Sequence, residues 1–193
     1  SGSRINLIGS IAGAACLGDD FDGVLPHLIS DATKIVSITV TEKAYGLDRA
    51  NKGCDIAHPA IAHDLENADN PIGVVGLVVL ALKLRRKNGT EPFTVLCCDN
   101  LPENGVMVRN AVVDFARRTD EELAAWITDN VAFPSTMVDR ITPAATSKTK
   151  QEAKLEIGLA DNAAVETEEF CQWVIEDNFP TGRPNWDIAG AVF

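Results

Sequence analysis

The chain has 193 residues, of which 46% are hydrophobic and 23% are charged, and its 17 basic and 28 acidic residues give a formal net charge of -11. This length suits one globular domain and excludes two complete ones, while the composition excludes a disordered or fibrous chain. The acidic balance argues against binding to nucleic acid or to an anionic membrane surface, because phosphate groups are bound by a basic face.

Hydrophobic periodicity predicts strands and helices in alternation along the chain. In chain order these are a strand at residues 4–8, a helix at 19–30, a strand at 34–40, a short helix at 60–65, a helix at 71–87, a strand at 93–98, helices at 106–117 and 121–130, and strands at 131–133 and 171–175. Residues 146–169 are polar and predict a loop or surface excursion. The alternation favours an α/β architecture with a largely parallel sheet.

Two apolar segments carry further information. Residues 93–98 are almost continuously apolar, which is typical of a strand that is covered on both faces. The run at residues 72–82 is too short to span a bilayer and leads into the basic residues 83–87, which we interpret as a solvated helix end. We therefore expect no membrane-spanning segment.

The five cysteines are an odd number, and Cys97 and Cys98 are adjacent within a predicted strand. Free thiols in a reducing compartment fit this pattern better than a disulfide framework, so we expect a cytoplasmic protein. Residues 1–3 lack an initiator Met and look like a cloning remnant, which leaves residues 4–193 as the folded part.

The common catalytic motifs do not occur in the sequence. It has no Gly-x-Gly-x-x-Gly, no phosphate-binding Walker loop, no nucleophile elbow and no Cys-x-x-Cys. Cys54, His58 and His63 lie within ten residues of one another, but their spacing matches no usual zinc site. We expect no metal.

Polar clusters follow two predicted strands. Residues 41–45 come after the strand at 34–40, and residues 99–105 come after the strand at 93–98. In an open α/β sheet, ligands bind outside the carboxyl ends of the strands, so both clusters are expected at one functional edge.

Four segments resemble landmarks of a known family in the same order. They are residues 41–45 (Thr-Glu-Lys-Ala-Tyr), 98–105, 131–143 (Val-Ala-Phe-Pro-Ser-Thr-Met-Val-Asp-Arg-Ile-Thr-Pro) and 173–180 (Trp-Val-Ile-Glu-Asp-Asn-Phe-Pro). The family is that of the long-chain mannitol 2-dehydrogenases and related polyol and hexuronate dehydrogenases, and the resemblance covers essentially the whole chain after residue 3.

This resemblance implies a Rossmann-like, largely parallel sheet with flanking helices. It also implies that the chain is the central part of a longer enzyme, without the N-terminal βαβ unit that bears a Gly-rich turn and without the C-terminal helical domain that carries the catalytic lysine. On this hypothesis residues 4–193 are a partial dinucleotide-binding domain that is inactive alone.

The implied reaction is metal-independent hydride transfer between NAD and a polyol or ketose. Three alternatives stay open: NADP as the cofactor, a hexuronate reductase acting on fructuronate or tagaturonate, and a non-catalytic module that acts by association. The sequence does not reveal the oligomeric state.

The resemblance also implies roles for single residues. Asn100 is expected to donate its amide to the substrate oxygen, with a turn-forming role as the alternative. Glu42 is expected to relay the proton from the lysine to solvent; the alternative is an ion pair with Lys43 or Arg140.

The remaining assignments concern the cofactor. Thr41, Val138 and Asp139 are expected to bind it; the alternatives are that Thr41 only ends a strand and that Asp139 fixes a loop. Asn104, next to Gly105, is interpreted as a helix entry or turn rather than as a reacting group.

Overall fold

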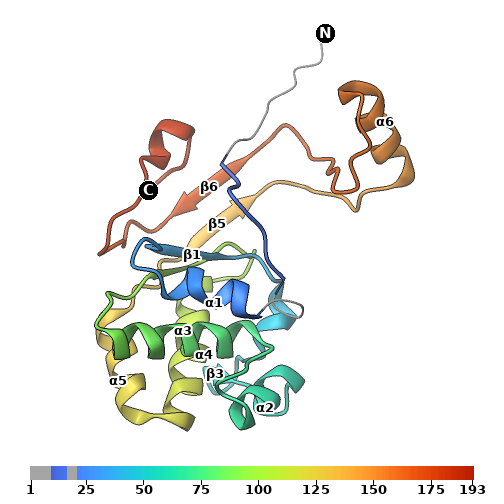
Figure 1. Cartoon of the computed structure of the whole chain (residues 1–193). Coiled ribbons are helices and arrows are strands. Elements are labelled where there is room, and N and C mark those ends of the chain that lie inside the picture. The colour runs from blue at the N-terminus through green and yellow to red at the C-terminus, as the bar shows by residue number, and fades with distance from the viewer. Residues whose placement is uncertain (1–9, 17–20) are drawn as a thin grey trace. The chain divides into compact units, whose positions relative to one another are not determined.

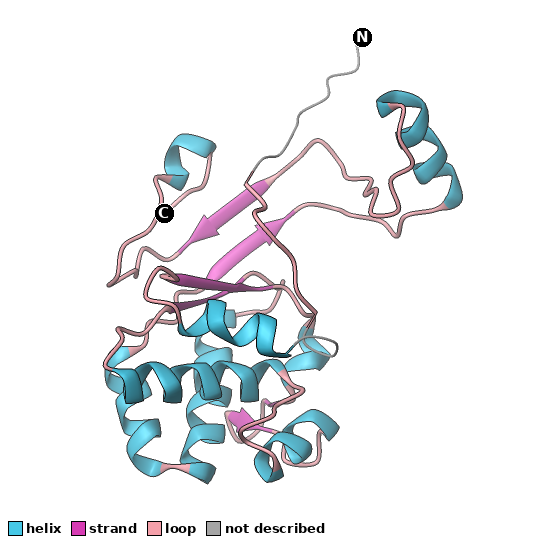
Figure 2. Cartoon of the chain, in the orientation of Figure 1, coloured by secondary structure: helices cyan, strands magenta, loops and turns pink. Residues whose placement is uncertain are grey.

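The computed structural model describes residues 10–16 and 21–193, in which helices and strands alternate as an α/β fold requires (Figures 1 and 2). The strand predicted at residues 4–8 lies outside the described residues. Contacts divide the described chain into a larger unit, residues 21–138 with 173–193, and a smaller unit containing residues 139–172.

The elements of the larger unit occur in the following order. They are α1 (Phe21–Ile29), β1 (Ile35–Ile38), a 3-10 helix η1 (Glu42–Tyr45), β2 (Leu47–Asp48), β3 (Gly53–Cys54), α2 (Pro59–Glu66), α3 (Val74–Asn88), β4 (Thr94–Cys97), α4 (Asn104–Thr119), α5 (Glu121–Asn130), β5 (Thr136–Asp139), β6 (Gln172–Ile175) and the 3-10 helix η2 (Trp186–Ala189). The unit boundaries fall at the last residue of β5 and the first residue of β6.

Strands β1 and β4 pair in parallel, which confirms the prediction for this sheet. Ile35 pairs with Thr94, and the register continues to Ile38 and Cys97. All four residues of β4 are buried, as its apolar run predicts. The carboxyl ends of both strands therefore lie at the same edge.

The strand prediction at residues 131–133 is wrong. This segment makes one ladder-like contact, in which the Val95 N–H donates to the Ala132 oxygen at 3.0 Å. Pro134 has no N–H with which to continue such a ladder. The chain instead forms β5 from Thr136 onward, and β5 pairs with the oppositely directed β6 (Figure 1).

The smaller unit also corrects a prediction. Residues 146–169, interpreted as a loop, contain α6 (Ser147–Ile157). Thr146 and Thr149 form a reciprocal capping box at its start, and Gly158 ends it in the left-handed conformation. Hydrophobic periodicity does not predict this helix, because most of its residues are polar and exposed and it therefore has no apolar stripe.

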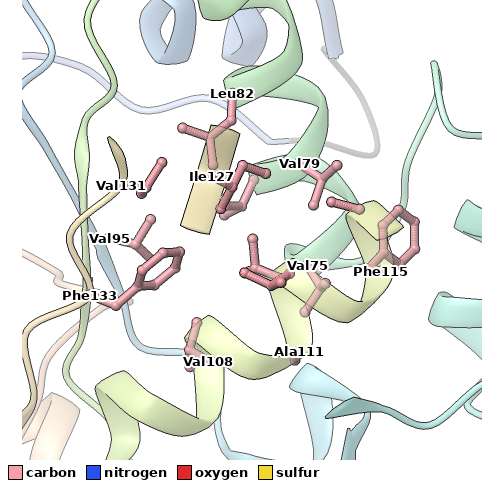
Figure 3. Packing of buried hydrophobic residues seen from close by; sticks show 14 of the residues in the cluster. Val75, Val79, Leu82, Val95, Val108, Ala111, Phe115, Ile127, Val131 and Phe133 are labelled. Atoms are coloured by element: carbon pink, nitrogen blue, oxygen red, sulfur yellow. The ribbon is translucent and has the colours of Figure 1, made fainter. Parts of the chain in front are cut away.

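The hydrophobic core lies in the larger unit. Figure 3 shows side chains from α3, β4, α4, α5 and the segment after α5 pointing toward one another. Those labelled are Val75, Val79, Leu82, Val95, Val108, Ala111, Phe115, Ile127, Val131 and Phe133. This packing gives the edge beyond β4 a rigid support.

The end of α3 is less solvated than its basic sequence predicts. Arg85 is fully buried, and its guanidinium donates to the backbone oxygens of Leu28, Ser30, Thr33 and Glu91 at 2.6–3.2 Å. Burial lowers the pKa of Arg85. The interpretation of residues 83–87 as a solvated helix end is therefore wrong at this position, because Arg85 ties α3 to the loop before β1.

Within residues 10–16 and 21–193, no helix combines the length and apolarity needed to cross a membrane. The same residues contain no cluster of three or more His, Cys, Asp or Glu side chains suited to a metal ion. All five cysteines are free thiols.

Candidate functional site

The polar clusters that follow β1 and β4 meet at one carboxylate. The Asp99 side chain accepts hydrogen bonds from the N–H groups of Val40 and Thr41 at 3.0 and 3.1 Å. The Tyr45 hydroxyl donates to the same carboxylate at 2.6 Å. Asp99 is the residue after Cys98 and precedes Asn100, so it joins the two loops in which functional residues are expected.

Thr41 has an unusual backbone conformation. Its φ of 72° and ψ of 154° lie in a region that is essentially reserved for glycine and costs a residue with a Cβ about 1–3 kcal/mol. The Thr41 side chain is exposed. Such strain persists only where the surroundings hold it, and here the Asp99 carboxylate binds the Thr41 N–H.

The Tyr45 hydroxyl is buried beside this carboxylate. It lies 3.1 Å from the Cys97 sulfur as well as 2.6 Å from Asp99. Burial, and then the hydrogen bond to Asp99, raise the pKa of Tyr45 far above its usual value. Tyr45 therefore remains a protonated donor.

Asn100 is exposed, and its side chain makes no hydrogen bond within the part of the chain that the structure describes. The turn at this point is closed by the backbone, through the Leu101 N–H and the Asp99 oxygen at 2.8 Å. The alternative in which the Asn100 amide closes its own loop is not observed. Its N–H donors are available to a ligand.

Glu42 differs from its predicted environment. It is the first residue of η1, its side chain is 52% exposed, and it forms an ion pair with Arg49. Neither Lys43 nor Arg140 is its partner. The assumption of a partly buried carboxylate is therefore wrong. Glu42 forms an ion pair with a cation other than the two expected, and its role as a proton relay remains a prediction.

Arg49 also lines a cavity. A space of about 280 Å³ lies between the β2–β3 hairpin and the start of α4, with Arg49 and Lys52 on one side and Glu103, Val106 and Met107 on the other. A second, open hollow beside the hairpin has both Glu42 and Arg49 in its wall. The hairpin thus places a cation next to the edge that carries Asn100.

The Asn104 side chain fixes the start of α4 below this edge. Asn104 is fully buried, and its Nδ2 lies 3.0–3.1 Å from the backbone oxygens of Cys97, Asp99 and Thr136. A Cβ at Gly105 would lie 2.4 Å from the Phe133 oxygen, so only glycine permits this approach. These contacts agree with the interpretation of Asn104 as a helix entry.

The two remaining predicted residues lie on β5. Val138 is half-buried in the larger unit, two residues after Thr136, which Asn104 ties to the end of β4. Asp139 is exposed and belongs to the smaller unit, where the neighbouring Arg140 donates to the Glu168 oxygen at 3.1 Å. The structure thus brings Thr41, Glu42 and Asn100 to one edge of the larger unit.

Two residues of this edge were missed by sequence reasoning. Asp99 could have been found, because a carboxylate that directly follows a buried strand and precedes Asn100 lies in the expected position for function. Arg49 carries no local signal, since only the fold of the hairpin brings it to Glu42.

Comparisons with known proteins agree with this architecture. Residues 2–188 match the family described as "Mannitol dehydrogenase Rossmann domain". The chain is 50% identical over 175 residues to the D-mannonate oxidoreductase of Escherichia coli K12, covering 91% of this chain and 36% of that protein. It is 43% identical over 193 residues to a mannitol 2-dehydrogenase of Cereibacter sphaeroides, covering all of this chain and 40% of that protein.

A solved structure is similar over nearly the same range. The ternary complex of the Pseudomonas fluorescens mannitol 2-dehydrogenase with NAD and D-mannitol matches with a TM-score of 0.91 and 40% identity, covering 96% of this chain and 38% of that chain. The chain thus spans between a third and two fifths of the length of these relatives. By sequence and by fold, it belongs to the mannitol dehydrogenase family, whose Rossmann domain it matches.

Proposed function

We propose that this chain binds the nicotinamide end of NAD at the edge beyond β1 and β4, and that within a longer polypeptide it takes part in hydride transfer between NAD and a polyol or ketose. The observation that carries the proposal is the exposed Asn100 side chain, whose amide has no partner among the described residues and stands beside the strained Thr41 loop. The similar enzyme named as a complex with NAD and D-mannitol supports it.

The residues present fit one end of such a cofactor. Dinucleotides bind outside the carboxyl ends of parallel strands, and β1 and β4 end together at this edge. Thr41 and Val138 are the proposed contacts in the larger unit. Asp139 remains a prediction from the family resemblance. The sequence contains no Gly-x-Gly-x-x-Gly turn for the pyrophosphate, so these residues would hold the nicotinamide side.

NAD, when bound at this edge, would supply the acceptor for the hydride of the alcohol carbon, and the hydroxyl proton would go to a base. Asn100 donates an amide hydrogen to the alcohol oxygen and stabilises the negative charge that develops on it as the proton leaves. By resemblance, the base is a lysine on a segment outside this chain. Glu42, exposed at the same edge, passes the proton to solvent.

The direct test uses a polypeptide that carries this chain together with the N-terminal βαβ unit and the C-terminal helical domain that the family resemblance implies. We expect NADH formation with mannitol and NADH consumption with fructose, and retention of activity after treatment with a metal chelator. The same assay with the isolated 193-residue chain is expected to give no turnover. Turnover by the isolated chain would contradict the assignment of the base to another segment.

A second candidate substrate is a sugar acid, which Arg49 favours. Its guanidinium already binds a carboxylate, that of Glu42, and lines the cavity beside the Asn100 loop. Arginine is suited to bidentate recognition of carboxylates, and the relative named D-mannonate oxidoreductase is 50% identical. A kcat/KM for fructuronate or tagaturonate that exceeds the value for fructose would select this candidate.

The assay also tests the alternative that the chain is a non-catalytic module acting by association. A longer polypeptide that binds neither NAD nor NADP and turns over none of these substrates would favour a module that acts by association. The free thiols support a cytoplasmic location for either function.

A further inference from the structure

We propose that Asp99 is a positioning residue for the reaction, holding Thr41 and Glu42 in place relative to Asn100. This inference rests on the proposed function. Asp99 is adjacent in sequence to Asn100, and it is bound to the residue that precedes Glu42. The Asp99 carboxylate is therefore linked to Asn100 through the chain and to Glu42 through the hydrogen bond to Thr41.

The geometry of the carboxylate supports such a role. Its Oδ2 accepts from the Val40 N–H and the Tyr45 hydroxyl, and its Oδ1 accepts from the Thr41 N–H. Three donors from the segment after β1 thus converge on a group at the end of β4. Tyr45 is fully buried, so its hydroxyl anchors the carboxylate from the core side.

The backbone of Thr41 provides the second line of evidence. Its conformation is one that a threonine does not adopt without restraint, and the Asp99 carboxylate binds both its N–H and that of the preceding residue. When the carboxylate is removed, Thr41 is expected to relax to negative φ. That rotation would move Glu42, which follows it directly, relative to Asn100.

If Asp99 only stabilised the fold, Asp99→Asn would lower Tm without a specific loss of kcat. Asp114 provides a matched control for this distinction. The Asp114 carboxylate also accepts a backbone N–H from a distant element, that of Cys54 at 3.1 Å, and it pairs with Arg118 at 3.1 Å. It is placed in no part of the proposed machinery. Asp99→Asn and Asp114→Asn each leave one oxygen as an acceptor and replace the other with an amide donor.

The experiment measures kcat, KM and Tm of the longer polypeptide with NAD and the better of mannitol and mannonate. Asp99→Asn is expected to lower kcat at least tenfold while the KM of the alcohol changes by less than threefold. Asp114→Asn is expected to lower Tm and to leave kcat within twofold. Adding Thr41→Gly to Asp99→Asn is expected to recover at least threefold in kcat, because glycine adopts positive φ without a Cβ penalty. This kcat is measured at saturating NAD, so that loss of the proposed Thr41 contact with the cofactor does not lower it.

A second measurement does not depend on activity. Amide hydrogen exchange of the 193-residue chain is expected to be at least tenfold faster at Val40 and Thr41 in Asp99→Asn than in the unsubstituted chain. At Cys54 the rate is expected to stay unchanged in this variant and to rise in Asp114→Asn.

The positioning role is overturned if an active polypeptide keeps its kcat within twofold after Asp99→Asn, or if Asp114→Asn lowers kcat equally. It is also overturned if Thr41→Gly recovers nothing, or if exchange at Thr41 does not change. An unsubstituted polypeptide that is inactive with every substrate contradicts the proposed function instead, so the two failures are distinguishable.

Discussion

Asn104 and Thr136 bind each other through reciprocal hydrogen bonds although 32 residues separate them. The Asn104 Nδ2 donates to the Thr136 oxygen at 3.0 Å, and the Thr136 N–H donates to the Asn104 Oδ1 at 2.9 Å. The Thr136 hydroxyl completes the arrangement by donating to the Cys97 oxygen at 2.6 Å. One buried amide thus joins the end of β4, the start of α4 and the start of β5, and so supports the edge that carries the proposed site.

Asn104→Ala is expected to destabilise the chain by about 2–4 kcal/mol, because it leaves the buried backbone N–H and oxygen of Thr136 without their Asn104 partner. Chemical denaturation followed by circular dichroism gives the free energy of unfolding. Asn130→Ala is the control, because Asn130 is exposed and is expected to change stability by less than about 0.5 kcal/mol. Equal effects of both substitutions would contradict the structural role of Asn104.

Arg85→Met is expected to cost at least about 3 kcal/mol of unfolding free energy, because four backbone oxygens lose a charged donor in a buried place. Arg86→Met is the control on the same helix. Arg86 lies 3.6 Å from the exposed Glu122, and this surface pair is expected to contribute less than about 1 kcal/mol. A cost of Arg85→Met that does not exceed the control would show that the guanidinium is not anchored as described.

The thiols are expected to differ in reactivity. Burial, followed by the hydrogen bond to Asp114, raises the pKa of Cys54 to about 12, and burial raises the pKa of Cys98 to about 11. Because the reacting species is the thiolate, raised values mean little reactive thiolate at pH 8. Cys16 and Cys171 are exposed.

Titration with an aromatic disulfide reagent at pH 8 is therefore expected to show two fast thiols in the folded chain and five in denaturant. The Cys16→Ser and Cys171→Ser variants are each expected to lose one fast thiol. Three or more fast thiols in the unsubstituted folded chain would contradict the low reactivity expected of the buried Cys54 and Cys97 and the half-buried Cys98.

Sequence reasoning predicted the elements that have strong apolar patterns. Strands β1 and β4, the helices α3 to α5 and the common edge of the two polar loops follow from hydrophobic periodicity and from where strands end. Helix α6 was missed because its signal is a capping box rather than an apolar stripe. The strand expected at 131–133 does not form, because Pro134 interrupts the ladder, and β5 begins at Thr136 instead.

The predicted site depended on the family resemblance for its residues, and sequence alone could not supply their environment. Whether Glu42 is exposed, and which cation pairs with it, depends on a hairpin whose strands have two residues each. The roles of Arg85 and Asn104 depend equally on long-range contacts, since both are polar side chains that the fold buries. Local sequence contains no information about such partners.

The free Asn100 amide is proposed to stabilise the developing negative charge on the substrate oxygen. The most direct measurement is kcat/KM of the longer polypeptide carrying Asn100→Ala, compared with the unsubstituted polypeptide and with Asn130→Ala. We expect a loss of about 100-fold or more, which is the usual effect of removing one such donor, and an unchanged value for Asn130→Ala. A kcat/KM for Asn100→Ala that equals that of the unsubstituted polypeptide would show that Asn100 does not stabilise this charge.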